Sequence, residues 1–195
     1  MMSHQFILVC QLIIFLSHEA HYPNVCEDAI KMVEVESDHP SEKSIVEVRF
    51  WDTGGDVDYD RIRVLSYPET DLFMIIYSVE RPESLEKVKT RWVHEIQAYC
   101  PGIPYILIGN KIDLRDSNVD PKDKYYHKLL PASKGEEMAK EIDAAAFFEC
   151  SALTRVGLDE MFIEAVRIAA KIRATEERHG HHKHNHPNSE KCALQ

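Results

Sequence analysis

The sequence is short of paired cysteines, of long apolar runs and of basic charge, and each shortage excludes a class of protein. Its five cysteines include no CxxC pair, so neither a disulfide framework nor a zinc knuckle is indicated. The apolar stretch from Phe6 to Leu16 is too short for a membrane-spanning helix, which needs about 20 residues. The formal net charge of −10 argues against a nucleic-acid partner, because phosphate backbones attract basic surfaces. A reduced, cytosolic protein is the expectation.

A length of 195 residues, with 44% hydrophobic and 29% charged residues, is typical of one globular domain with tails. The N-terminal apolar stretch leaves one alternative open, a cleaved signal peptide. Against it, the leading MMSHQ has no lysine or arginine, and no clean small-x-small cleavage site follows. We therefore expect residues 6–16 to form a buried strand that runs into a short apolar segment.

Strand and helix patterns alternate along the chain and predict its fold class. Apolar and charged residues alternate at 33–36 and at 46–50, on either side of a turn at 38–40, which predicts an antiparallel hairpin. Short apolar runs predict buried parallel strands at residues 71–78, 104–110 and 145–150. Apolar residues at helical spacing predict helices from near Pro82 to Cys100, from about Lys134 to Ile142 and from Leu158 to about Arg173. The expected fold is three-layer α/β, with a mostly parallel sheet and one antiparallel edge hairpin.

Two motifs follow predicted strands, at the sheet edge where a doubly wound fold binds its ligands. Asn110-Lys111-Ile112-Asp113 follows one strand, and Ser151-Ala152-Leu153 follows the next. Together they resemble the guanine-specificity loops of small GTPases. An isolated NKxD sequence also occurs by chance in solvated loops. The pairing with SAL after the next strand is what favours a guanine pocket.

The resemblance assigns a role to the residues of both loops. Asp113 would read the base, because a carboxylate accepts from both the ring N–H and the exocyclic amine of guanine. Lys111 would lay its methylenes over the base and ribose, Asn110 would tie the two loops together, and the Ala152 amide would donate to the guanine oxygen. The nucleotide-binding residues implied in these loops are Asn110, Lys111, Asp113, Ser151, Ala152 and Leu153. The implied ligands are GTP and GDP with Mg²⁺.

A third motif, Trp51-Asp52-Thr53-Gly54-Gly55, resembles the DxxG motif of the same family, with Gly54 where alanine is usual. By this resemblance Asp52 holds the magnesium water, and Gly55 offers its amide to the γ-phosphate. The alternative is a plain glycine turn that leaves a strand. Residues 58–71 then closely match the switch II segment of Rho proteins, and an inserted segment at about 117–130 is also Rho-like. The chain is similar to the Rac and Rho branches over roughly residues 22–170.

The phosphate-binding loop of the family, GxxxxGK[ST], is absent. In the family this loop follows the first strand, where its amides, lysine and hydroxyl bind the phosphates and Mg²⁺. Here the first glycine is Gly54 and the first lysine is Lys31, so the first thirty residues cannot supply it. Residues 11–20 are also too few for a loop of about 8 residues and a helix of about 10. We expect residues 1–20 to be a divergent segment with a remnant first strand, and the first βα unit to be truncated.

Two substitutions add to the expected loss of activity. Asn24 stands where the family has a magnesium-binding threonine, so the implied metal ligands, Asp52 and Asn24, are a poorer set. Asp56 stands at the position of the catalytic glutamine that orients water. A carboxylate cannot donate to the transition state, and its charge repels the γ-phosphate. We therefore expect Asp56 to be defective and both nucleotide binding and hydrolysis to be impaired.

The C-terminal residues carry a lipid-anchor signal. Cys192-Ala193-Leu194-Gln195 is a CaaX box, and a final glutamine favours farnesylation of Cys192. A chance match is the alternative. Residues 174–195 are polar and histidine-rich, which predicts a flexible tail with adventitious rather than specific metal binding. The expected location is the cytoplasm, partly at the cytoplasmic face of membranes.

The resemblance implies a Rho-type GTPase domain over residues 21–173, a signalling switch that acts on cytoskeletal effectors. Its implied partners are exchange factors, activating proteins, dissociation inhibitors and Rho effectors. GTP hydrolysis is the family activity, and whether this chain retains it stays open. The alternative is a nucleotide-independent interaction module, or a truncated isoform disabled by its missing segment.

Overall fold

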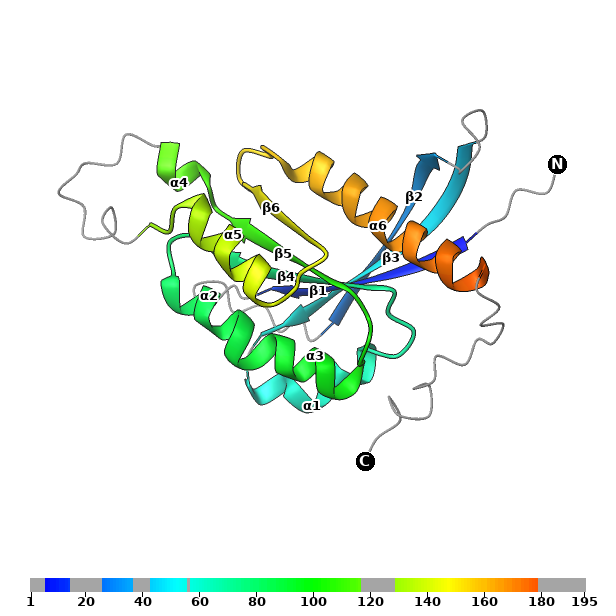
Figure 1. Cartoon of the computed structure of the whole chain (residues 1–195), viewed down its shortest axis with the longest axis horizontal. Helices are drawn as coiled ribbons and strands as arrows, with labels where there is room; N and C mark the ends of the chain where they lie inside the picture. The colour runs from blue at the N-terminus through cyan, green and yellow to red at the C-terminus, as the bar shows by residue number, and fades with distance from the viewer. Residues whose placement is uncertain (1–5, 15–25, 37–42, 56, 117–128, 179–195) are drawn as a thin grey trace.

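A six-stranded sheet in the order β2-β3-β1-β4-β5-β6 lies at the centre of the protein (Figure 1). The computed structural model describes residues 6–14, 26–36, 43–55, 57–116 and 129–178. The strands are β1 (Phe6–Ile14), β2 (Cys26–Glu36), β3 (Lys43–Gly54), β4 (Leu72–Ser78), β5 (Tyr105–Asn110) and β6 (Ala146–Cys150). β2 pairs with β3 antiparallel, and the other neighbours are parallel. The prediction of a mostly parallel sheet with one antiparallel edge hairpin is confirmed.

The N-terminal apolar stretch forms β1, as its composition predicts. Its last residue, Ile14, lies opposite Gly54 of β3 and Ile76 of β4. The first strand of the fold is therefore present, with its carboxyl end between those of β3 and β4. Residues 15–25, which connect β1 to β2, lie outside the described residues.

Helices cover both faces of the sheet. The longer ones are α2 (Pro82–Lys87), η3 (Val88–Trp92), α3 (Val93–Tyr99), α5 (Ala132–Glu141) and α6 (Leu158–Arg178). The short ones are η1 (Val57–Tyr59), α1 (Asp60–Arg63), η2 (Val64–Ser66) and α4 (Asp113–Asp116). The predicted helix from Pro82 runs through α2, η3 and α3, and η3 is a π-helical turn within it. α6 continues to Arg178, past the expected start of the tail at residue 174, because no glycine or proline interrupts it before Gly180.

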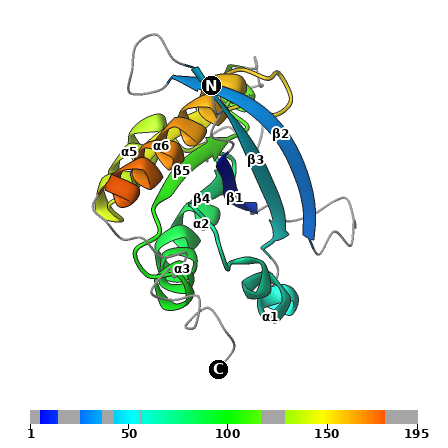
Figure 2. The same cartoon turned by 90° about the vertical axis from the view of Figure 1, so that its right-hand side faces the viewer.

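The side chains of β4 show how the sheet joins two hydrophobic cores. Leu72 and Met74 face a core shared with α6, whereas Phe73 and Ile75 face a core shared with α2, η3, α3 and α5. All four are fully buried. α6 accordingly lies on one side of the sheet and α2 and α3 on the other (Figures 1 and 2). Burial on both faces explains why the central strands are continuous apolar runs.

Tyr77 of β4 is a polar side chain buried in the second core. It is buried, and its hydroxyl has no hydrogen-bond partner among the described residues. Burial raises the pKa of this phenol, so it stays neutral. Two glycines make room for the ring: a Cβ at Gly109 would lie 2.7 Å from Tyr77 Oη, and one at Gly135 would lie closer still. The hydroxyl is therefore accommodated but unsatisfied.

We predict that Tyr77→Phe raises the free energy of unfolding by about 1 kcal/mol, because it removes an unsatisfied buried hydroxyl. Urea unfolding followed by circular dichroism measures the change. Tyr105→Phe is the matched control, since the Tyr105 hydroxyl donates to the Ile142 carbonyl at 2.5 Å, and it should destabilise by about the same amount. A loss of stability in Tyr77→Phe would show that its hydroxyl has a partner.

Candidate functional site

The Asn110 side chain joins the two loops that follow β5 and β6. Its Oδ1 accepts hydrogen bonds from the Lys111 amide at 2.7 Å and from the Ala152 amide at 3.1 Å. Asn110 and Cys150 are the last paired residues of β5 and β6, so the loops leave the sheet side by side. The link expected of Asn110 is present. The Ala152 amide, which the resemblance assigns to the guanine oxygen, is bonded to Asn110 here, so a base has to share or displace that bond.

Asp113 is oriented by the second loop. It begins α4, and its Oδ1 accepts a hydrogen bond from the Ser151 hydroxyl at 2.5 Å. Ser151 is fully buried, and its Oγ also accepts from the Thr154 amide at 3.1 Å. Ser151 therefore holds the carboxylate rather than contacting a ligand from the surface. Leu153, by contrast, is 82% exposed and does not enclose a binding pocket.

The backbone after β6 turns sharply at Gly157. This glycine has a φ of +70°, and a Cβ there would lie 2.5 Å from the Glu149 carbonyl oxygen. Only glycine fits both the conformation and the space. The Ser151 amide donates to the Val156 carbonyl at 2.9 Å and closes the loop that carries Ala152.

Lys111 extends from the first loop toward the turn after β4. Its backbone is left-handed, with a φ of +70°, and its amide is the one bound by Asn110. Its ammonium forms an ion pair with the carboxylate of Glu80. The turn that carries Glu80 is itself attached to β5, because the Val79 amide donates to the Asn110 carbonyl at 3.0 Å. Sequence reasoning missed Glu80, since no motif contains it.

The DxxG residues lie farther along the same edge of the sheet. Asp52 is opposite Leu12 of β1, and Gly54 is opposite Ile14. Asp52 and Gly55 are both half-buried at the carboxyl end of β3. β3 and β5 are three strand positions apart in the sheet, or about 14 Å at the usual spacing. The structure thus brings together the base-reading residues, whereas Asp52 and Gly55 lie near the carboxyl end of the neighbouring strands β1 and β3. Asn24, Asp56 and Cys192 lie outside the described residues.

Arg63 anchors the segment that resembles switch II. Its guanidinium is buried and donates to both Glu95 oxygens, at 3.0 and 2.7 Å, and to Asp60 at 2.6 Å. A further bond of 2.9 Å reaches the Gly54 carbonyl. One side chain therefore ties α1 to α3 and to the end of β3. Neither the periodicity nor the motif match predicts this pairing with Glu95.

Aromatic residues complete the surroundings of Arg63. The Tyr67 hydroxyl donates to Glu95 at 2.5 Å, and burial raises the pKa of Tyr67. The Trp92 ring contacts two guanidinium groups, with Arg63 at 4.9 Å and Arg91 at 4.3 Å from the ring centroid. Because Arg91 also donates to Asp60, the charges of this cluster are paired.

Arg115 anchors the start of the expected Rho-like insertion. Its guanidinium binds Glu149 of β6 in a bidentate pair, with both bonds at 2.7 Å. It also donates to the Leu130 carbonyl at 2.7 Å, on the far side of residues 117–128. The two ends of the insertion are thereby held against β6.

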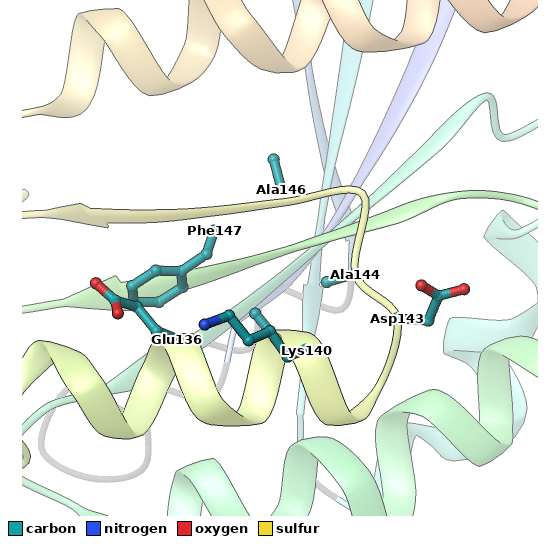
Figure 3. Close-up of a pocket in the computed structure, with 7 residues that line it drawn as sticks. Glu136, Lys140, Asp143, Ala144, Ala146 and Phe147 are labelled. Atoms are coloured by element: carbon teal, nitrogen blue, oxygen red, sulfur yellow. The ribbon is translucent and has the colours of Figure 1, made fainter.

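A hollow of about 430 Å³ lies elsewhere, between α5 and β6 (Figure 3). Glu136 and Lys140 of α5, Asp143 and Phe147 contribute to its lining. It includes Ala146, the first residue of β6, so it lies at the opposite end of the strands from the candidate site. The hollow is therefore separate from the loops that would read a base.

The described residues fit one half of a guanine nucleotide. Asp113 and the loop of Ala152 suit the base by their chemistry. On the phosphate side, Asp52 and Gly55 lie at the carboxyl end of β3, but the connection from β1 to β2, residues 15–25, contains no glycine, lysine or arginine. Such a segment does not fit phosphates. Across the described ranges, no group of three His, Cys, Asp or Glu side chains could hold a metal ion. Nor does any described helix have the length and apolarity to cross a membrane.

A mostly parallel α/β sheet with two linked loops after β5 and β6 defines the class as a domain of the small GTPase type. Residues 10–171 match the family model described as the Ras family. This match covers most of the chain, and the protein belongs to the Ras family of small GTPases. Members of the family are GTP-binding signalling switches that bind GTP or GDP with Mg²⁺.

We predict that Arg63→Lys lowers the free energy of unfolding by roughly 2 to 4 kcal/mol, because lysine cannot form the paired bonds to Glu95 and leaves a buried carboxylate short of donors. Arg61→Lys is the control, because Arg61 lies on the same short helix but is exposed, and it should change stability by less than about 0.5 kcal/mol. Urea unfolding of both variants tests this. Equal effects would show that the Arg63 cluster does not stabilise the fold.

Proposed function

We propose that this protein is a Rho-type member of the family that retains guanine recognition and has lost most phosphate binding. The observation that carries the proposal is the Asn110 link, which holds Asp113 and the loop of Ala152 together without any phosphate loop. The match of residues 58–71 to switch II, and the inserted segment anchored by Arg115, support the Rho type.

The affinity lost with the missing loop can be calculated from the hydrogen bonds that such a loop contributes to phosphate binding. Backbone amides and a lysine that donate to charged oxygens contribute roughly 1.5 to 3 kcal/mol each. Four such losses total about 6 to 12 kcal/mol, or roughly four to nine decades of affinity, as an upper bound because the terms are not additive. The base contacts remain. We therefore propose weak binding that prefers guanine and gains little from phosphates or Mg²⁺.

The proposed role is that of a signalling protein whose switch surface meets the family's regulators and cytoskeletal effectors. Hydrolysis would be slow, because Asp56 occupies the position of the water-orienting glutamine. A second candidate is an interaction module that works without nucleotide. The Arg63 cluster supports it, since the hydrogen bonds from Arg63 to Glu95 hold α1 to α3.

Isothermal titration with GMP, GDP and GTP, each with and without Mg²⁺, tests the proposal. We expect weak binding, with similar dissociation constants for the three ligands. These constants should be lower than those of the adenine nucleotides. Asp113→Ala should abolish the preference for guanine because it removes the acceptor for the ring N–H and amine.

Asp159→Ala is the control for that titration, since Asp159 is an exposed carboxylate on α6, and it should bind like the wild type. Tight, Mg²⁺-dependent binding that strengthens from GMP to GTP would overturn the proposal. If no guanine ligand binds at all, the nucleotide-independent module becomes the better description.

For localisation we propose prenylation at Cys192 with partial membrane attachment. One prenyl chain gives only marginal, reversible binding, and the residues before it carry little net positive charge. We expect cell fractionation at pH 7.4 to find the protein in both fractions, with Cys192→Ser wholly soluble. The membrane share should rise on acidification as the tail histidines gain charge. Unchanged attachment of Cys192→Ser would rule out this anchor.

A further inference from the structure

The ion pair between Glu80 and Lys111 lies within the candidate site and belongs to none of its motifs. Both side chains are partly buried, with 27% of Glu80 and 37% of Lys111 exposed. The two residues follow neighbouring strands, since Ser78 of β4 lies opposite Asn110 of β5. The contact is therefore set by the sheet register.

Both ends of the Lys111 side chain are held. At the backbone, Asn110 Oδ1 binds the Lys111 amide at 2.7 Å, and the φ of +70° sets the direction in which the side chain leaves. At the far end, Glu80 binds the ammonium. A lysine anchored in this way keeps its methylenes in one place, which suits the face of a base, because little rotamer entropy remains to be lost on binding.

The position of Glu80 bears on what else the site can bind. The strand order β1-β4-β5-β6 places the turn after β4 between the base-reading loops and the end of β1. A ligand whose base contacts Asp113 and whose phosphates extend toward β1 and Asp52 must pass this turn. Glu80 is carried by this turn, and its carboxylate is paired with the Lys111 ammonium.

We propose that Glu80 is a specificity-determining residue that excludes phosphate groups and makes this a site for the base and ribose of a guanine nucleoside. The inference rests on the proposed guanine recognition and adds the selection against phosphate. Glu80 acts in two ways. Its negative charge repels a phosphate, and its ion pair occupies the Lys111 ammonium, which would otherwise bind a phosphate.

The test compares guanosine with GDP by isothermal titration of wild type, Glu80→Gln and Glu83→Gln. Glu83→Gln is the matched control, because Glu83 is an exposed carboxylate on α2 and its replacement changes the net charge equally. Relative to guanosine, GDP should gain about tenfold in affinity in Glu80→Gln, and this gain should shrink at high salt. Glu83→Gln should leave the ratio of the two affinities unchanged.

An unchanged ratio in Glu80→Gln, or an equal gain in Glu83→Gln, would overturn the inference. Equal weakening of guanosine and GDP in Glu80→Gln would also overturn it, because Glu80 would then only support the fold. Thermal unfolding confirms that each variant is folded before titration.

A second probe separates this inference from the proposed function. Pyrophosphate contains no base, so its effect does not depend on guanine recognition. At millimolar concentration it should shift the Lys111 side-chain NMR signals in Glu80→Gln and not in the wild type. The same response in both proteins would overturn the role of Glu80. Failure of guanosine to bind the wild type would instead overturn the guanine recognition itself.

Discussion

The candidate site depends on a single side-chain oxygen, the Oδ1 of Asn110. It binds the Lys111 and Ala152 amides, and so fixes both the direction of the Lys111 side chain and the position of the loop after β6. The same loops are also joined by the Ser151 hydroxyl, which donates to Asp113, and by the Ile112 amide, which donates to the Cys150 carbonyl at 3.3 Å. Because Asn110 also ends β5, the precision of the site comes from the rigid sheet rather than from the loops.

A separate cluster around Arg63 organises the segment that resembles switch II. In a family that switches, this segment has to respond to the γ-phosphate. Here a buried guanidinium joins it to Glu95 and to the Gly54 carbonyl, so leaving this arrangement means breaking several charged hydrogen bonds at once. This arrangement of the segment is therefore stabilised by charged hydrogen bonds within the protein.

The base-binding and phosphate-binding sides of the expected nucleotide site differ in the residues that they contain. On the base side the two loops are linked by hydrogen bonds, whereas the sequence on the phosphate side has no loop of glycines and lysine. With a net charge of −10 the whole chain also opposes polyanions. Glu80 follows β4, between β1 and β5 in the strand order, and pairs with Lys111. Under the proposed function, the net charge and the missing loop both act against phosphate binding.

The sequence by itself determined the elements and the family. The alternation of apolar residues in β2 and β3, the apolar runs of β4 to β6 and the spacing from Pro82 are local patterns, and each forms the structure that it predicts. The NKxD and SAL motifs were likewise readable, because each is a short run of residue types after a strand.

Only the tertiary structure decided which distant side chains meet. Glu80 reaches Lys111, and Arg63 reaches Glu95, across gaps of about thirty residues that no periodicity spans. Such pairs depend on the order and register of the strands and on how the helices pack against them. These are set by the burial of two hydrophobic cores at once, a property of the whole chain that no local segment contains.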